Sequence, residues 1–318
     1  MKGWQFTKTN APLELVEIED PKVKPGHVVI DTGAVGICHS DVGVLEDPGW
    51  MDLLDVPRIM GHENAGTISE VGEDVEGFEV GERVAICPTG PSGTAPGYAY
   101  DGRFGSKILA PISDLVKVPK ELSIKEAASA TDAGMTSYHA IFTRGKAKPG
   151  MKIGLLGIGG RGQFGLQAAL ASGIEDVYAI DNSEKARELA EKLGAKKVVS
   201  DVKELKDENL DLIVDFAGAG DTVKESLETV GFGGTVVLVG MASLQASVNV
   251  TDFITGSKKL IASNGGTPED ISAIYELMAS GELTPTLTEI TFDEIPEGIE
   301  KLKRGEVLGR LVAIYDKK

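Results

Sequence analysis

Two short segments place potential metal ligands beside glycine residues. The segment GICHSD, residues 36–41, contains Cys38, and GHENAG, residues 61–66, contains His62. Thiolate and imidazole groups are both preferred zinc ligands, and a catalytic zinc takes three protein ligands while one position stays open for water or substrate. The two residues can supply two ligands of such a site, or each can be an ordinary core residue.

A glycine-rich loop is the second segment with chemical meaning. The residues GIGGRG, 157–162, fit the pattern GxGxxG between a strand-like run, IGLLGIG, and a helix-like run, GQFGLQAALASG. In that context Gly157, Gly159, Gly160 and Gly162 permit a tight turn and a close backbone approach, and the helix N-terminus offers free N–H groups to a pyrophosphate. The loop therefore predicts a dinucleotide-binding site, against the simpler interpretation of turn-forming glycines.

An acidic residue follows this loop at a meaningful distance. Asp181 ends the next strand-like run, DVYAID, 19 residues after Gly162. A carboxylate at that place accepts both ribose hydroxyls of an adenosine and repels the extra phosphate of NADP, so NAD is predicted. Lys185 and Arg187 lie one helical turn further on and keep NADP open as the alternative. The competing interpretation makes Asp181 a helix cap.

Composition limits the classes of function. The 318 residues suffice for two domains with separate cores. Lys and Arg total 32 against 49 Asp and Glu, and the net charge of −17 argues against a nucleic-acid partner. That acidity is also found in proteins of salt-tolerant hosts, but a role in solubility is the simpler explanation. We find no membrane-spanning run and no secretory signal, so a cytoplasmic location is expected.

The rhythm of apolar residues changes along the chain. Residues 2–123 show short β-rich runs separated by turn signals, which predict an antiparallel barrel or sandwich. After residue 150, strand-like runs alternate with amphipathic helical runs and predict a doubly wound parallel sheet. Thr267 and Pro268 mark a helix start, and that helix is expected to end near Gly281. A final strand is predicted in GRLVAIY.

The longer segment GHENAGTISEVGEDV resembles the zinc signature of the medium-chain dehydrogenase/reductase family, the zinc alcohol dehydrogenases. GICHSD upstream and GIGGRG downstream occur in the family's order, and the resemblance covers nearly the whole chain. It implies an α/β protein with a GroES-like antiparallel barrel as its catalytic domain, residues 1–132 completed by 264–318. A Rossmann domain, 133–263, is inserted between these parts.

The resemblance also implies a ligand set and an activity. Cys38 and His62 match the first two zinc ligands, and the third is expected near TDAGMTSYHA, where Asp132 stands in place of the common cysteine. A carboxylate is an acceptable zinc ligand and preserves the formal charge of the site, although Asp132 can instead be a helix N-cap. Glu63 would complete the sphere when no substrate is bound. The implied reaction is hydride transfer between a primary or secondary alcohol, or a polyol, and NAD(H).

Further residues carry roles in the related enzymes. Asp41 resembles the carboxylate that orients the liganding histidine. Ser40 matches the hydroxyl that accepts the alcohol proton. Arg310 resembles an arginine that pairs with Glu63 and reaches the cofactor pyrophosphate, unless it is a plain surface residue. His39 lies where the family often places a basic residue near the pyrophosphate, unless it is an ordinary exposed histidine. Substrate-pocket candidates, each also explicable by packing alone, are Trp50, Tyr98 and Tyr100.

Two departures from the family pattern matter. Residues 87–102 hold only Cys87, so the structural zinc of longer relatives is not expected and Cys87 is predicted to be a core residue at a strand end. Gly43 stands where relatives have a relay histidine, so the proton would leave through cofactor ribose hydroxyls and water. This glycine favours an alternative activity, reduction of activated C=C bonds. Metal-free quinone reduction and a non-catalytic NAD-binding sensor are further alternatives. A homodimer or homotetramer, joined near residues 235–263, is implied by the resemblance alone.

Overall fold

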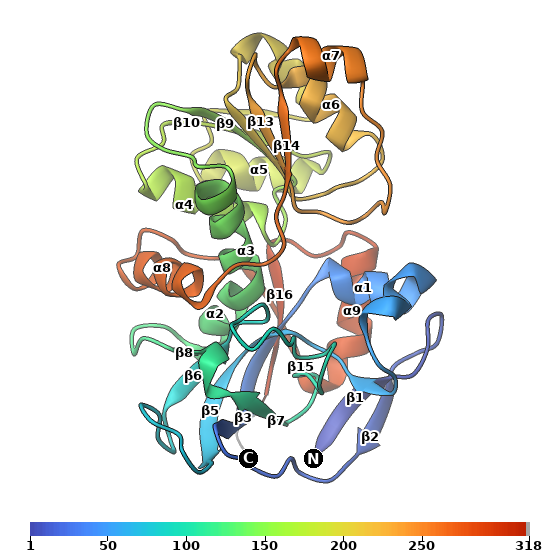
Figure 1. The fold of residues 1–318 in the computed structure, drawn as a ribbon, viewed down its shortest axis with the longest axis vertical. Coiled ribbons are helices and arrows are strands. Elements are labelled where there is room, and N and C mark those ends of the chain that lie inside the picture. Colours follow the sequence, from blue (N-terminus) through green and yellow to red (C-terminus); the bar gives the residue numbers. More distant parts are fainter. Residues whose placement is uncertain (316–318) are drawn as a thin grey trace. The chain divides into compact units, whose positions relative to one another are not determined.

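The computed structural model describes residues 1–315, and the chain divides into two compact units (Figure 1). Unit 1 comprises Met1–Met135, Gly266–Ala279 and the chain from Leu287 onward, and unit 2 comprises Thr136–Gly265 and Ser280–Thr286. These borders lie close to the predicted ones after residues 132 and 263, but the return of Ser280–Thr286 to unit 2 was not predicted. The last three residues of the predicted catalytic domain, 316–318, lie outside the described residues.

Unit 1 is built on two sheets. The smaller sheet has the order β2-β1-β4, and the larger one has seven strands in the order β15-β16-β3-β5-β6-β8, with β7 paired to β3. Their bounds are β1 Lys2–Phe6, β2 Glu14–Glu17, β3 His27–Ile37, β4 Arg58–Ile59, β5 Glu63–Val71, β6 Arg83–Ile86, β7 Lys107–Pro111, β8 Leu115–Lys117, β15 Leu287–Thr291 and β16 Arg310–Ile314. The pairs are antiparallel except β15 with β16. The final strand predicted in GRLVAIY is β16.

Strand β3 is the centre of the larger sheet. It pairs with β5 along one side, and with β7 and then β16 along the other. Its pairing with β5 shifts between Thr32 and Ala34, which marks a bulge. Opposite this bulge lies Gly66, where a Cβ atom would collide with the backbone oxygen of Asp31. Glycine is therefore required at position 66 for the two strands to approach.

Unit 2 contains one parallel sheet. Its order is β11-β10-β9-β12-β13-β14, and every pair is parallel. The bounds are β9 Lys152–Leu156, β10 Asp176–Ile180, β11 Lys197–Val199, β12 Leu212–Asp215, β13 Thr235–Leu238 and β14 Lys259–Ala262. The order reverses at β9, so the carboxyl ends of β9 and β12 border a crevice of the kind in which such sheets bind ligands.

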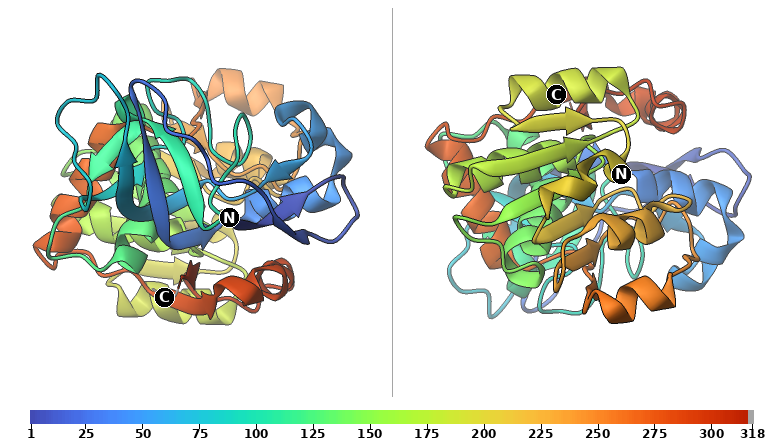
Figure 2. Two further views of the ribbon diagram at one scale, coloured as in Figure 1. Left: turned by 90° about the horizontal axis from the view of Figure 1, so that it is seen from below. Right: turned by 90° about the horizontal axis from the view of Figure 1, so that it is seen from above.

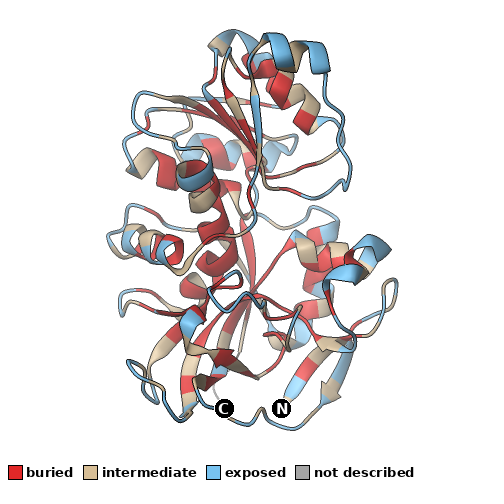
Figure 3. Cartoon of the chain, viewed as in Figure 1, coloured by how far each residue is buried: buried red, intermediate tan, exposed pale blue. Residues whose placement is uncertain are grey.

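Helices cover both faces of this parallel sheet (Figure 2). Side chains alternate along each strand, so Val177 of β10 joins the cluster packed under α4 and α5, while Tyr178 joins the cluster packed under α6. The strands between the two helical layers are largely buried, whereas α7 has no buried residue (Figure 3). The predicted combination of a mainly antiparallel unit with a doubly wound parallel unit is confirmed.

The helices begin close to where the sequence predicts them. Helix α8 starts at Pro268, and Thr267 caps it by accepting from the backbone N–H of Asp270. The bounds are α1 His39–Glu46, α2 Ile124–Ser129, α3 Met135–Tyr138, α4 Gly162–Ala171, α5 Glu184–Lys192, α6 Thr222–Thr229, α7 Val250–Thr255, α8 Pro268–Ala279 and α9 Ile295–Lys303. Within residues 1–315, no helix has the length and apolar character needed to cross a membrane.

Substitution of Gly66 by alanine is expected to destabilise unit 1. The added Cβ would meet backbone atoms of β3, which cannot rotate away as a side chain can, so we expect a loss of about 1–3 kcal/mol in the free energy of unfolding. Denaturant unfolding measures this. Glu70→Ala, at an exposed position of the same strand, is the matched control and should change stability by less than about 0.5 kcal/mol. Equal stability of the Gly66→Ala variant and the parent would contradict the packing argument.

Candidate functional site

Three potential metal ligands from distant parts of the sequence converge in unit 1. One ligand atom each from Cys38, His62 and Asp132 lies within 4.8 Å of the other two, and all three residues are buried. Cys38 directly precedes α1, and His62 directly precedes β5. Asp132 lies inside a π-helical turn, Ala130–Gly134, that continues from α2, so it is not the helix N-cap considered from the sequence.

The imidazole of His62 lies between two carboxylates. Its Nδ1 is 3.6 Å from Oδ1 of Asp41, and its Nε2 is 3.8 Å from Oδ2 of Asp132. Asp41 also accepts a hydrogen bond from the backbone N–H of Cys38, at 2.8 Å, which closes a capping box at the start of α1. One carboxylate thus contacts both the histidine and the backbone of the cysteine, so helix capping and the position of both potential ligands are linked.

A buried arginine connects the end of the chain to this group. Nε of Arg310 donates to Oε2 of Glu63 at 2.6 Å, and Nη2 donates to Oδ2 of Asp132 at 2.9 Å. Arg310 is only 4% exposed, which excludes a plain surface role. Glu63 also accepts from the backbone N–H of Ala133 at 2.8 Å and is not part of the converging ligand group. A Cβ at Gly36 would collide with the Glu63 carboxylate, so this strand position requires glycine.

Buried carboxylates gather in this group. Asp41, Glu63 and Asp132 are all buried, and Arg310 contacts the last two of them. Burial raises the pKa of Glu63 to about 7, with Arg310 opposing the shift. Burial alone would lower the pKa of His62, but the charge of Asp41 and the contacts with Asp132 and Cys38 raise it well above its usual value. Both shifts indicate an environment that favours an additional positive charge. A thiol, an imidazole and a carboxylate in such surroundings fit a zinc ion.

Polar and aromatic side chains border the metal group. The hydroxyl of Ser40 is buried and has no well-formed hydrogen bond among the described residues. The ring of Tyr98 lies 5.7 Å from that of His62, and burial raises its pKa to about 12 against smaller opposing effects of His62 and Ser40. Trp50 packs over Gly43, where a Cβ atom would come within 2.8 Å of the indole. The indole therefore fills the space that a side chain at position 43 would need.

The structure does not bring every predicted residue to this group. Tyr100 packs against the apolar cluster between β3, β5 and β7, and its surroundings include Asp114 and Arg103, not His62. His39 is the exposed first residue of α1. Cys87 is fully buried directly after β6, as predicted for a core residue. Tyr100 is therefore a half-buried residue packed against the unit 1 core, not a member of the metal group.

The ion pair between Arg310 and Asp132 was not predicted. These residues lie 178 positions apart, and only the pairing of β16 with β3 brings the end of the chain beside β5 and the π-helical turn. A buried arginine in the run GRLVAIY was the available sequence signal, because a cation in an apolar strand requires an acidic partner. The sequence could not say which acid this would be.

The glycine-rich loop of unit 2 has the predicted conformation. Gly157 has φ +92°, and helix α4 begins at Gly162, where a Cβ atom would collide with the backbone oxygen of Gly157. The backbone N–H of Ile158 donates to Oδ2 of Asp181 at 2.7 Å, and that of Ser183 donates to Oδ1 at 2.8 Å. Asp181 therefore connects the loop to the end of β10.

Two basic residues follow Asp181 in the chain, and only one of them is bonded to the backbone beside it. Nη1 of Arg187 donates to the backbone oxygens of Asp181 and Asn182, both at 2.9 Å, whereas Lys185 is exposed. Arg187 is thus held beside Asp181.

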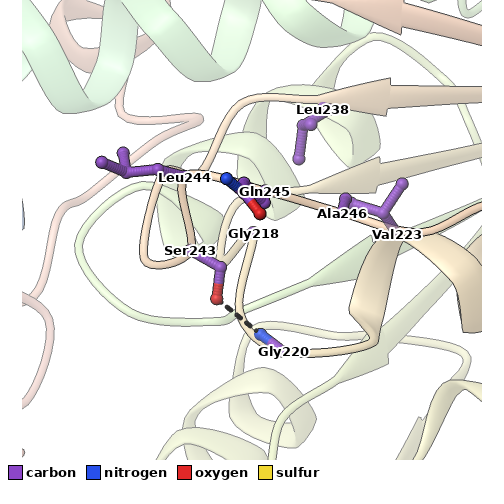
Figure 4. A pocket seen from close by; sticks show the side chains of 8 residues that line it. All are labelled: Gly218, Gly220, Val223, Leu238, Ser243, Leu244, Gln245 and Ala246. Carbon is purple, nitrogen blue, oxygen red and sulfur yellow. Dashed lines mark hydrogen bonds between the residues drawn. The ribbon is translucent and has the colours of Figure 1, made fainter.

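A small pocket lies at the carboxyl ends of β12 and β13 (Figure 4). Apolar side chains line it, and Ser243 accepts a hydrogen bond from the backbone N–H of Gly220 at 3.0 Å. The loops after the two strands meet where a Cβ at Gly218 would collide with Gly240. The buried carboxylate of Asp215 organises the first loop by accepting from the N–H groups of Ala217 and Gly218. The pocket belongs to the edge at which a doubly wound sheet binds its ligand.

Comparisons with known proteins agree with this architecture. A family model described as an alcohol dehydrogenase GroES-like domain matches residues 24–120, and one described as a zinc-binding dehydrogenase matches residues 160–280. An alcohol dehydrogenase from Geobacillus stearothermophilus is 30% identical over 336 aligned residues, which cover 98% of each chain.

Solved structures give the same result. The alcohol dehydrogenase from Aeropyrum pernix superposes with a TM-score of 0.92 at 28% identity and covers 99% of this chain and 100% of its own. An acetophenone reductase from Geotrichum candidum, solved in complex with NAD, has a TM-score of 0.91 at 28% identity, with 98% of this chain and 96% of its own covered. With family models on both units and sequence identity along nearly the whole chain, this protein belongs to the zinc-dependent medium-chain dehydrogenase/reductase family.

Proposed function

We propose that this protein is an NAD(H)-dependent dehydrogenase that interconverts a small alcohol or polyol and its aldehyde or ketone, with one zinc ion at Cys38, His62 and Asp132. The observation that carries the proposal is the convergence of these three buried side chains among buried carboxylates. The match to alcohol dehydrogenases supports the reaction class, and the NAD complex of a similar reductase supports the cofactor.

The chain's own residues would prepare the reaction as follows. A zinc ion held by the three ligands would act as a Lewis acid toward the oxygen of an alcohol or carbonyl substrate. Asp41 would hold the imidazole of His62 in the orientation and tautomer that present Nε2 to the metal. Arg310 would restrain Asp132 and balance part of the buried negative charge. These contacts position the ligands before substrate arrives.

Proton transfer is assigned to Ser40. Its buried hydroxyl lies two residues from Cys38 and lacks a well-formed hydrogen bond among the described residues. It can therefore relay a proton, taking one from a bound alcohol as it passes its own hydroxyl proton onward. Tyr98 would form part of the substrate pocket beside His62, and the indole of Trp50 would exclude water from the space above Gly43. The proton would then leave through the cofactor ribose hydroxyls and water.

Cofactor selection is assigned to Asp181. Its carboxylate oxygens already accept two backbone N–H groups and retain lone pairs for ribose hydroxyls. A 2′-phosphate would meet this carboxylate, so NADP is disfavoured in spite of Arg187 nearby. The glycine loop and the N-terminus of α4 would receive the pyrophosphate.

Reduction of an activated C=C bond is the second candidate activity. The observation that favours it is the packing of Trp50 over Gly43, which leaves no room for a relay side chain at that position. Product analysis of an α,β-unsaturated ketone with NADH separates the candidates, because a saturated ketone reports C=C reduction and an allylic alcohol reports carbonyl reduction.

Metal content tests the zinc proposal. The parent should hold about one zinc per chain, and Asp132→Ala and Cys38→Ala should lose it on dialysis because each removes one of three ligands. Elemental analysis of purified protein measures this. Cys87→Ala is the matched control, since its thiol is buried away from the metal group and the variant should retain zinc. A freshly prepared, unchelated parent without zinc would refute the proposal, and zinc retained in Asp132→Ala would assign the third ligand to Glu63.

Substitution of Ser40 by alanine tests the proton-transfer role. We expect kcat for alcohol oxidation to fall about 10²-fold or more, with zinc content unchanged, because a positioned proton acceptor contributes about that much. Steady-state kinetics across pH provide the measurement. Ser272→Ala, on an exposed position of α8, should keep the parent kcat. A Ser40→Ala variant as active as the parent would remove Ser40 from the mechanism.

Substitution of Asp181 by alanine tests cofactor selection. The Kd for NAD should rise roughly 10-fold to 100-fold, since hydrogen bonds to a charged group contribute about 1.5–3 kcal/mol. Affinity for NADP should fall less or improve, because the repelling charge is gone. Calorimetric titration with both cofactors distinguishes this outcome from simple loosening of the loop, which would weaken both equally. Asp176→Ala, at the opposite end of β10, is the control.

A further inference from the structure

A second buried arginine lies in unit 1, away from the metal group. Arg103 is 0% exposed, and its Nη1 donates to the backbone oxygen of Ile30 at 3.1 Å and to Oγ1 of Thr32 at 2.8 Å. Room for the guanidinium depends on Gly66, where a Cβ atom would come within 2.7 Å of Nη2. Unlike Arg310, this arginine is bonded through its side chain to neutral oxygens only.

Several donors in this place have no acceptor. Nε and Nη2 of Arg103 and the hydroxyl of Tyr100 are buried and have no hydrogen-bond partner among residues 1–315. Burial lowers the pKa of Arg103 to about 10, so the side chain stays charged at neutral pH. Tyr100 and Arg103 lie three positions apart in the chain, and each influences the pKa of the other. A buried cation with unused donors is costly unless an acceptor of opposite charge is present.

The nearby carboxylates do not accept hydrogen bonds from the unpartnered donors of Arg103. Asp31 acts on Arg103 electrostatically, but it is exposed on β3 and makes no hydrogen bond with the guanidinium. Asp114, which acts on Tyr100, is already saturated by N–H and hydroxyl donors from Ser92 and Ser113. The buried guanidinium is therefore without a contacting carboxylate in the part of the chain that the structure describes.

Tyr100 is half-buried. It lines a pocket of unit 1 together with Lys24, His27, Asp101 and Lys107. Glu19 also lines this pocket, and Lys107 forms an ion pair with Asp20 at 2.7 Å. The unpartnered N–H groups of a buried cation, together with the unpartnered hydroxyl of Tyr100, point to a site for an acceptor that carries negative charge.

We propose that Arg103 and Tyr100 form a binding site for a small monovalent anion, with chloride as the ligand at ordinary salt concentrations. A halide accepts several hydrogen bonds at once and neutralises the guanidinium, whereas a water molecule in the same place supplies acceptors but no charge. The bound anion stabilises the bulge of β3 and the facing Gly66, which Arg103 contacts. The site uses no residue of the metal group, so it is independent of the proposed dehydrogenase function.

Thermal unfolding at constant ionic strength tests the proposal. Sodium chloride is exchanged stepwise for sodium gluconate, whose anion is too large for the site. The parent Tm should rise with the logarithm of chloride concentration above the Kd, because a ligand that binds only the folded state stabilises it by mass action. Arg103→Met should lose this chloride dependence, and Tyr100→Phe should shift it to roughly 10-fold higher chloride, as expected for one lost hydrogen bond to a charged group.

A matched variant separates a specific site from general salt effects. Arg83 is a partly buried arginine of unit 1, and its guanidinium donates to the backbone oxygens of Pro119 and Leu122. Arg83→Met should lower the Tm but keep the chloride dependence of the parent. The same dependence in Arg103→Met and Arg83→Met, or none in the parent, would overturn the proposal.

Bromide provides a direct measurement that does not depend on the folding of Arg103→Met. Crystals of the parent and of Tyr100→Phe soaked in sodium bromide should show an anomalous peak within hydrogen-bond distance of Nε or Nη2 of Arg103, weaker in the variant. A water molecule without anomalous signal, a carboxylate of the chain at this place, or bromide only at surface lysines would each refute the anion site.

Discussion

The buried contact of Arg310 with Glu63 and Asp132 is the interaction on which the catalytic unit depends. It joins β16, from the end of the chain, to β5 and to the π-helical turn after α2. Gly36 leaves space for the Glu63 carboxylate, which also accepts a hydrogen bond from the backbone N–H of Ala133. Loss of the arginine would leave two carboxylates buried without their cation, which is among the most destabilising changes a core can suffer.

The same contact sets the electrostatics of the proposed metal site. Asp41, Asp132 and the Cys38 thiol lie close to His62, and Glu63 shares Arg310 with Asp132. The raised pKa values of His62 and Glu63 show that this environment favours further positive charge. A divalent cation would supply that charge, so the binding of zinc and the stability of this region should rise and fall together. Asp132 takes part both in the contact with Arg310 and in the proposed metal site. Its Oδ2 accepts a hydrogen bond from Arg310 and also faces His62.

The buried guanidinium groups of Arg310 and Arg103 in unit 1 differ in the groups that contact them. Arg310 is paired with carboxylates, and its charge contributes to an acidic site. Arg103 is bonded through its side chain to a carbonyl and a hydroxyl, and its remaining donors require an acceptor from solution. Gly36 leaves room for the Glu63 carboxylate that Arg310 contacts, and Gly66 leaves room for the guanidinium of Arg103. Space beside the backbone therefore matters as well as charge in placing these side chains inside the sheet.

The sequence by itself determined the local and repeating features: the strand and helix rhythm, the start of α8 and the glycine loop. These follow from periodicity, capping and glycine conformation, which act over a few residues. The grouping of Cys38, His62 and Asp132 was also predictable, but only through a family resemblance. Tertiary structure alone decided that Arg310 contacts Asp132, that Trp50 fills the space above Gly43, and that Tyr100 packs against the unit 1 core. Such contacts depend on strand register and on the space left between side chains. Both are set by segments far apart in the chain, so the sequence of one segment does not predict them.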